Sequence, residues 1–156
     1  MKITFPDKTI REYDSGTSAL EVAASISEGL ARNVLAAKVN GEVKDANLPI
    51  NSDSTLQLLT WNDDQGKSVM WHSSAHLLAE ALEALFPGVK LGIGPPVDNG
   101  FYYDVDLGGK SFSSDDFPKI EQKILELARE KNSFDRKEIS KANAISFYQD
   151  KGDEYK

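Results

Sequence analysis

Two Asn-Gly pairs, one in each half of the chain, constrain the fold more than any other feature of the sequence. Asn40-Gly41 and Asn99-Gly100 each lie between two extended runs rich in apolar residues. An Asn-Gly pair in this setting is the strongest short-range signal for a two-residue β-hairpin, because both residues tolerate a positive φ. The sequence therefore predicts an antiparallel hairpin in each half.

A polar break at residues 61–67 separates the two halves. It contains Gly66 and lies between segments that each have an apolar pattern of their own. We predict a first domain at residues 1–61, a linker at 62–67 and a second domain at 68–156.

The first segment has the element order of a small mixed sheet with one helix. Residues 2–5 and 9–13 form a predicted hairpin. Ser18 and Glu21 fit a capping box. The helix that they open is expected to end at Gly29 and to turn Ala24 and Ile26, among others, toward the core. The second hairpin and a last strand complete the order strand–strand–helix–strand–strand–strand, which is the ubiquitin-like β-grasp pattern. The segment has no histidine and no phosphate-binding loop, so a binding or spacer role is favoured.

The second segment predicts an α+β unit around a strong amphipathic helix at residues 69–86. One apolar stripe follows the helix, made by Trp71, Ala75, Leu78, Leu82 and Leu85. After the hairpin a second helix starts at residues 113–116, a strand is expected near 134–139, and Ser140 caps a short last helix.

The candidate chemistry lies in His72 and His76, the only histidines of the chain. A spacing of four puts both imidazoles on one helix face, one turn apart and beside the apolar stripe. Such a pair can orient a water, a metal ion or a substrate group, or can be a coincidence of the helix surface. No cysteine, third histidine or suitably placed carboxylate would complete a metal site, so we predict that the pair holds no metal.

Gly92 and Gly94 predict a close approach in the run that precedes the second hairpin. A bulge, a packed helix or a ligand would each account for two glycines in an extended segment. A dinucleotide site is excluded because there is no third glycine and no helix follows.

Composition excludes several classes of protein. The net charge of -7 argues against a non-specific nucleic-acid binder. The absence of cysteine excludes disulfides, thiol nucleophiles and iron–sulfur clusters within these residues. No apolar run reaches the roughly 18–20 residues of a membrane span, and the first residues have no secretion signal. We therefore expect a protein that is not secreted and does not bind membranes.

Together these motifs resemble one known family. The run from His72 to Leu82, followed by Ile93-Gly94-Pro95-Pro96 and Asp98-Asn99-Gly100-Phe101-Tyr102-Tyr103-Asp104, resembles the editing domain of bacterial-type threonyl-tRNA synthetases. Residues 39–45 of the first segment resemble the TGS domain that precedes it. The resemblance covers nearly the whole chain in the right order. It implies a β-grasp TGS domain followed by a truncated α+β editing domain.

The resemblance also implies residue roles. Members of this family hydrolyse wrongly formed Ser-tRNA at a site that pairs a His-x-x-x-His with a Cys-x-x-x-His further along, through water and side chains and without zinc. His72 and His76 match the first pair, as catalytic residues. The positions that match substrate-binding residues are Gly94, Pro95, Tyr103 and Lys156. Cysteine is absent, so the second pair is missing.

Further expectations follow from the same resemblance. The chain would be a truncated N-terminal part of a ligase that joins threonine to tRNA(Thr) with ATP, and would be inactive alone. It would bind no cofactor, since ATP, magnesium and zinc belong to the absent catalytic domain. The full enzyme would be cytoplasmic and would form a homodimer through its missing domains. Two alternatives remain open, a free-standing trans-editing hydrolase and a non-enzymatic regulatory module built on a TGS domain.

Overall fold

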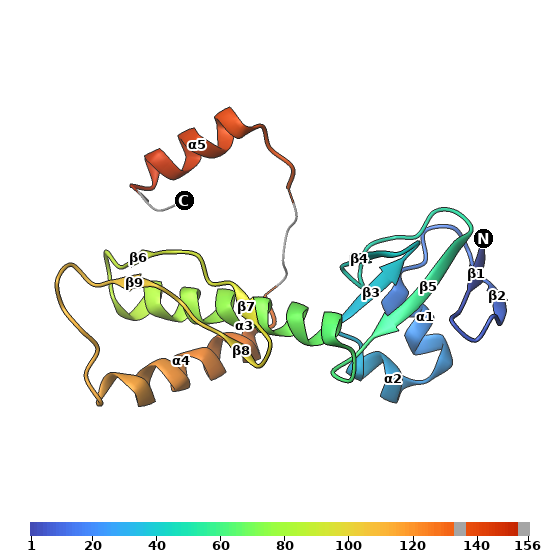
Figure 1. Ribbon diagram of the computed structural model, residues 1–156, viewed down its shortest axis with the longest axis horizontal. Coiled ribbons are helices and arrows are strands. Elements are labelled where there is room, and N and C mark those ends of the chain that lie inside the picture. The colour runs from blue at the N-terminus through green and yellow to red at the C-terminus, as the bar shows by residue number, and fades with distance from the viewer. Residues whose placement is uncertain (133–136, 153–156) are drawn as a thin grey trace. The chain divides into compact units, whose positions relative to one another are not determined.

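The computed structural model describes residues 1–132 and 137–152. The chain divides into two compact units, Met1–Met70 and Trp71–Lys156. Each unit combines helices with strands, so the α+β prediction is confirmed (Figure 1). No helix among the described residues is long and apolar enough to cross a membrane.

The first unit contains one five-stranded mixed sheet. Its strands are β1 (Lys2–Thr4), β2 (Ile10–Glu12), β3 (Ala36–Val39), β4 (Glu42–Lys44) and β5 (Ser54–Leu59). They lie in the order β2-β1-β5-β3-β4. β1 and β5 pair in parallel, and every other neighbouring pair is antiparallel.

The helices α1 (Ala19–Ile26) and α2 (Glu28–Asn33) lie along this sheet (Figure 1). α1 packs against the sheet through Ala19 and Val22, which share a buried cluster with Ile3 and Leu56. This arrangement is the predicted β-grasp. Its inward positions alternate along the strands, so that Ile3 and Leu56 are almost inaccessible to solvent.

The capping box at α1 is confirmed, but the predicted helix end is wrong. The Ser18 hydroxyl accepts from the backbone N–H of Glu21, and the Glu21 carboxylate accepts from the N–H of Ser18. α1 ends at Ser27, whose extended backbone stops the helix while its hydroxyl caps α2. A serine hydroxyl can accept a hydrogen bond from a backbone N–H that has no carbonyl partner at a helix start, so Ser27 can cap α2. Gly29 therefore lies inside α2, and Ile26 is 39 % exposed.

The Asn40-Gly41 hairpin forms as predicted. Asn40 has φ 51° and Gly41 has φ 87°, which are the two positive values that a tight hairpin turn requires. Val39 pairs with Glu42 on either side of the turn. The Asn40 side chain also accepts from the backbone N–H of Thr55 at 2.9 Å, which ties the turn to β5.

The long helix α3 (Asp64–Leu85) begins five residues earlier than the sequence predicts. The carbonyl of Asp63 accepts from the N–H of Lys67 and starts the helix, while the Asp63 carboxylate accepts from the N–H of Thr60 at 2.8 Å. Acidic and polar residues are typical of loops, but they also favour a helix N-terminus. Residues 64–67 of the predicted linker are therefore helical. The domain bounds 1–61, 62–67 and 68–156 remain a prediction.

The second unit contains four two-residue strands and two further helices. The strands are β6 (Lys90–Leu91), β7 (Pro96–Val97), β8 (Gly100–Phe101) and β9 (Val105–Asp106). The helices are α4 (Asp116–Glu130) and α5 (Lys141–Asp150). The core joins Leu82 of α3, Leu91 of β6 and Ile120 of α4. Ser140 caps α5 as predicted, and residues 137–139 form no strand, while 134–136 lie outside the described residues.

The second hairpin is confirmed, but its turn is displaced by one residue. Asp98 and Asn99 form the turn, and Val97 pairs with Gly100. Gly100 has φ 150°, a conformation that L side chains rarely adopt, so it serves as the first residue of β8. Gly100 therefore belongs to strand β8 and not to the turn.

Candidate functional site

The two histidines contact each other directly on α3. Nε2 of His72 and Nε2 of His76 lie 3.1 Å apart, and the two rings meet edge to face with centroids 4.6 Å apart. One Nε2 must carry a proton and the other must accept it for this distance to be a hydrogen bond. The pair therefore places one imidazole N–H and one imidazole lone pair at a single point on the helix surface.

α3 presents this pair to solvent because its opposite face is buried. Ala75, Ala79 and Leu82 are buried, while His72 and His76 are exposed. This is the face offset that the spacing of the apolar stripe predicts. Burial of the stripe fixes the rotation of the helix and thereby the direction in which both imidazoles point.

An aromatic contact beside His72 is not evident from the sequence. The rings of Trp71 and Phe101 lie 6.4 Å apart between centroids and are tilted by 48°. Trp71 precedes His72 in α3, and Phe101 belongs to β8. The contact therefore joins α3, next to His72, to the second hairpin. A sequence signal is present, since an aromatic residue adjoins each motif, but nothing in it indicates that the two rings meet.

The connection between the two short ladders carries one extra residue. Leu91 pairs with Val105, and Pro96 pairs with Phe101. Between these pairs, residues 92–95 lie opposite residues 102–104, so four residues face three. This irregular stretch, called the bulge below, lies between two separate two-stranded ladders.

Gly94 and Tyr103 are brought together at this bulge. A Cβ atom at Gly94 would overlap the Tyr103 ring, at 2.5 Å from Cδ2 and 3.1 Å from Cζ. Gly92 also lies close to its neighbour, since its N–H donates to the carbonyl of Asp104 at 2.9 Å. Both glycines therefore serve the approach of the facing strand, and no ligand is needed to explain them.

The remaining predicted residues are placed less fully. Pro95 is half-buried and follows Gly94 in the bulge. Lys156 lies outside the described residues. Within residues 1–132 and 137–152, no three His, Asp or Glu side chains gather as metal ligands.

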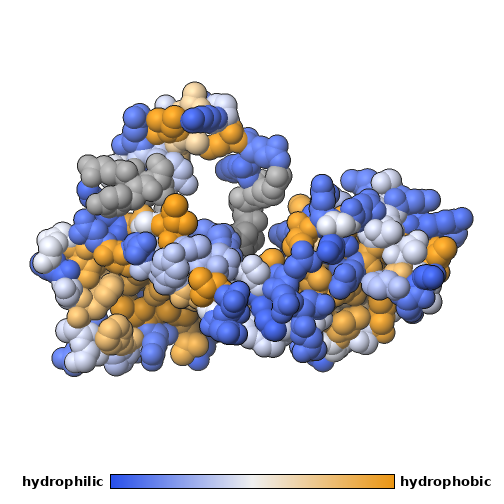
Figure 2. All heavy atoms as spheres, viewed as in Figure 1, coloured by the Kyte–Doolittle hydropathy of each residue, from blue (hydrophilic) through white to orange (hydrophobic). Residues whose placement is uncertain are grey.

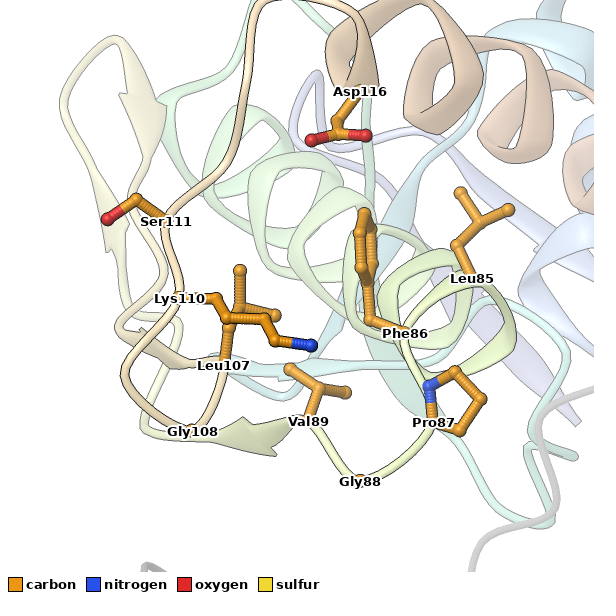
Figure 3. Close-up of a pocket in the computed structure, with 10 residues that line it drawn as sticks. All are labelled: Leu85, Phe86, Pro87, Gly88, Val89, Leu107, Gly108, Lys110, Ser111 and Asp116. Carbon is orange, nitrogen blue, oxygen red and sulfur yellow. The ribbon is translucent and has the colours of Figure 1, made fainter.

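A large cavity of the second unit lies away from the histidines. It measures about 570 Å³ and is formed where α3 ends and α4 begins, around Phe86, Val89 and Leu107 (Figure 3). Lys110 and Asp116 contribute the charged groups at its edge. The hydroxyl and the N–H of Ser113 bind the Asp116 carboxylate and hold its pKa below the usual value. Neither His72 nor His76 lines this cavity, so it is separate from the candidate site.

Apolar side chains also remain on the surface of the second unit. Figure 2 shows a group of them on the visible face in the region of α4, where Phe117 and Leu125 are exposed. Ile93 and Tyr102, at the bulge, are 73 % and 55 % exposed. Large apolar side chains near the candidate site are therefore exposed, whereas those in the core of the first unit are buried.

Comparisons with known proteins give matches to this chain in sequence. The TGS domain model matches residues 1–60. The threonine--tRNA ligases of Cytophaga hutchinsonii, Parabacteroides distasonis and Bacteroides thetaiotaomicron are 65 %, 55 % and 51 % identical to the chain over 156 residues. Each match covers all of this chain and 24 % of the ligase, so the chain spans about a quarter of the length of these relatives. The chain is therefore similar to threonine--tRNA ligases along its whole length, and residues 1–60 carry a TGS domain.

Proposed function

We propose that this chain is the N-terminal part of a threonine--tRNA ligase and that its second domain helps to hydrolyse Ser-tRNA(Thr). The observation that carries the proposal is the 3.1 Å contact between Nε2 of His72 and Nε2 of His76 on the exposed face of α3. All 156 residues of the chain align with a threonine--tRNA ligase, and 65 % of them are identical.

Physical chemistry explains why such a ligase needs a hydrolytic site. Serine lacks one methyl group of threonine, and a missing methyl group changes binding by only about 1–3 kcal/mol. Selection at the synthetic site is therefore too weak, and serine becomes attached to tRNA. A second site that destroys the wrong product supplies the missing discrimination.

The proposed reaction is the hydrolysis of an ester. Water attacks the carbonyl carbon of the seryl group, and the bond from that carbon to the ribose oxygen breaks. The ribose oxygen takes up a proton, and serine leaves as the acid. The Nε2 lone pair that accepts within the histidine pair can instead take a proton from the attacking water, because neutral imidazole is a base near neutral pH.

The other site residues receive their roles from the same proposal. His72 and His76 act on the water, and Tyr103, Gly94, Pro95 and Lys156 contact the substrate. A Cys-x-x-x-His pair has to come from residues outside this chain. We therefore expect the 156-residue chain alone to show neither threonine activation nor hydrolysis of Ser-tRNA.

A double substitution in a full-length ligase that carries this sequence tests the proposal. His72→Ala with His76→Ala is expected to abolish hydrolysis of Ser-tRNA and to leave synthesis of Thr-tRNA unchanged. Glu83→Gln is the matched control, since Glu83 is also exposed on α3. Undiminished hydrolysis in the double variant would overturn the proposal. Loss of both activities would show that the histidines serve folding instead, and would overturn it equally.

The remaining features belong to the same proposal. The domains are 1–61 and 68–156, joined by 62–67, and neither binds a cofactor or a metal. ATP, magnesium and zinc bind elsewhere in the ligase. The partner is tRNA(Thr), the full enzyme is a homodimer through its other domains, and it acts in the cytoplasm.

Elemental analysis of the purified chain tests the metal prediction, and stoichiometric zinc lost in His76→Ala would contradict it.

A further inference from the structure

We propose that Gly94 is a positioning residue, which fixes the ring of Tyr103 and thereby the direction of its phenol group. The proposal rests on the proposed function, because it assigns to Tyr103 a place in the hydrolytic site. It gives Gly94, beside the substrate contact proposed above, a second role toward the Tyr103 ring. Gly94 acts through the ring that occupies the space where a side chain would stand.

The contact is too close to tolerate any side chain at position 94. A Cβ atom there would lie 2.5 Å from Cδ2 and 3.1 Å from Cζ of Tyr103, whereas real Cβ atoms essentially never approach a heavy atom within 3.0 Å. The Tyr103 side chain also packs against the buried cluster of the second unit, which includes Leu82 and Leu91. The ring is thus held between a bare backbone and the core.

The backbone conformation of Gly94 does not by itself require glycine. Gly88, Gly100 and Gly108 have positive φ values and open space where a Cβ atom would stand, so they are needed for their conformation. Gly94 shows the opposite combination, since its φ lies outside that positive range and its Cβ position is filled. Among the glycines described in this unit, the overlap with an aromatic ring is found at Gly94. The residue is therefore explained by Tyr103.

The bulge supplies the reason why the ring lies there. Four residues, 92–95, face three, 102–104, so the facing strand is displaced by one position. The displacement brings Tyr103 over Gly94 and leaves Tyr102 exposed. A methyl group at position 94 would push the ring off the backbone and rotate its hydroxyl away. Misplacement of a catalytic or binding group by about 1 Å can reduce a rate about 100-fold.

Nuclear magnetic resonance of the 156-residue chain tests the geometry without any activity. A proton on Cα of Gly94 should show an upfield ring-current shift, which Tyr103→Phe retains and Tyr103→Leu removes. Gly94→Ala should change the chemical shifts of the Tyr103 ring, while Ile93→Ala should not, because Ile93 is 73 % exposed at the same bulge. A Gly94 Cα proton that does not respond to Tyr103→Leu would overturn the proposal.

A double substitution separates positioning from a general loss of structure. Gly94→Ala should lower the unfolding temperature, and Gly94→Ala with Tyr103→Ala should recover part of the loss, because the smaller side chain vacates the space. Destabilisation that is equal in the single and double variants would contradict the proposed overlap.

The activity measurements are made in the full-length ligase. Gly94→Ala should lower kcat for Ser-tRNA hydrolysis about 100-fold, close to the effect of Tyr103→Ala, and the double variant should lose no more than Tyr103→Ala alone. A wild-type rate in Gly94→Ala, with His72→Ala/His76→Ala inactive, would overturn positioning and leave the proposed function intact. Activity in the histidine variant would instead overturn the proposed function, while the resonance experiment still decides on the ring.

Discussion

The two units of the chain differ in how their backbone is paired. In Met1–Met70, β1 to β5 form one continuous sheet, and a buried cluster around Ile3 and Leu56 closes beneath α1. In the second unit, the ladders β6–β9 and β7–β8 are two residues long on each strand, and the backbone between them is irregular.

This difference shows where a functional site can form. Regular sheet uses its backbone groups for pairing and its side chains for the core, so it leaves few groups for chemistry. The bulge at residues 92–95 and the exposed face of α3 place Tyr103 and the two histidines outside such pairing. The candidate site residues therefore lie in the second unit, at positions that are exposed or half-buried.

Truncation of the two cores is the largest test of this comparison. Leu56 and Leu82 are 1 % and 2 % exposed, and burial of this degree makes Leu→Ala cost about 2–5 kcal/mol. We expect Leu56→Ala to destabilise the first unit and Leu82→Ala the second. Urea unfolding followed by amide resonances of each unit measures the two effects separately.

Equal destabilisation of both units by either substitution would contradict this difference between the units. Leu125→Ala on α4 is the control, since Leu125 is more than half exposed and its truncation should change stability by less than about 0.5 kcal/mol.

Gly66 provides the next largest effect, at the start of α3. Ala normally stabilises a helix interior by about 1 kcal/mol relative to Gly. A Cβ atom at Gly66 would overlap the carbonyl oxygen of Thr60 and lie 3.0 Å from its carbon. Because backbone atoms cannot move aside cheaply, we expect Gly66→Ala to destabilise the first unit by about 1–3 kcal/mol, measured by urea unfolding. A gain in stability would show that Thr60 and α3 separate easily.

The sequence predicts most of the first unit because its signals are local and agree with one another. The Ser18 capping box, the Asn40-Gly41 turn and the first predicted hairpin each determine a few residues, and the structure contains all of them. The error at Ser27 arises because one serine both ends α1 and caps α2, a double use that resembles an ordinary surface residue.

The candidate site is predictable in its residues but not in its contacts. The spacing of His72 and His76 indicates one exposed face, which the structure confirms. Gly92 and Gly94 indicate a close approach, but the sequence does not identify Tyr103 as the residue that approaches Gly94. The helical conformation of residues 64–67 is also not evident from the sequence, since polar residues occur both in loops and in the first turn of a helix.

The two Asn-Gly pairs give a smaller and sharper test. Asn40 has φ 51° and its side chain accepts from Thr55, whereas Asn99 has neither a positive φ nor a side-chain bond of this kind among the described interactions. We expect Asn40→Ala to cost about 1–2 kcal/mol, from strain in the left-handed region and the lost bond, and Asn99→Ala less than about 0.5 kcal/mol. Thermal unfolding of both variants measures the difference, and equal costs would contradict the displaced turn in the second hairpin.

The smallest expected effect concerns two carboxylates that bind a serine three residues before them, one in each unit. The N–H and hydroxyl of Ser18 lower the pKa of Glu21, and the hydroxyl and N–H of Ser113 lower the pKa of Asp116.

A group whose pKa is lower in the folded state stabilises the fold at pH values above its ordinary pKa. It loses that contribution as the pH falls through the lowered pKa. The stabilisation is therefore complete at pH 7 and declines in acid, below the ordinary values of 4.5 for Glu21 and 3.8 for Asp116. Glu21 is exposed and Asp116 is half-buried at the surface, where water still weakens such contacts, so the change is small. Glu21→Gln and Asp116→Asn keep an accepting oxygen but cannot titrate, and the stability difference between each variant and the original chain should shrink between about pH 7 and pH 3. A difference that stays constant over this range, in unfolding temperatures recorded at both pH values, would show that the serine contacts do not contribute to folding through the charge of the carboxylate.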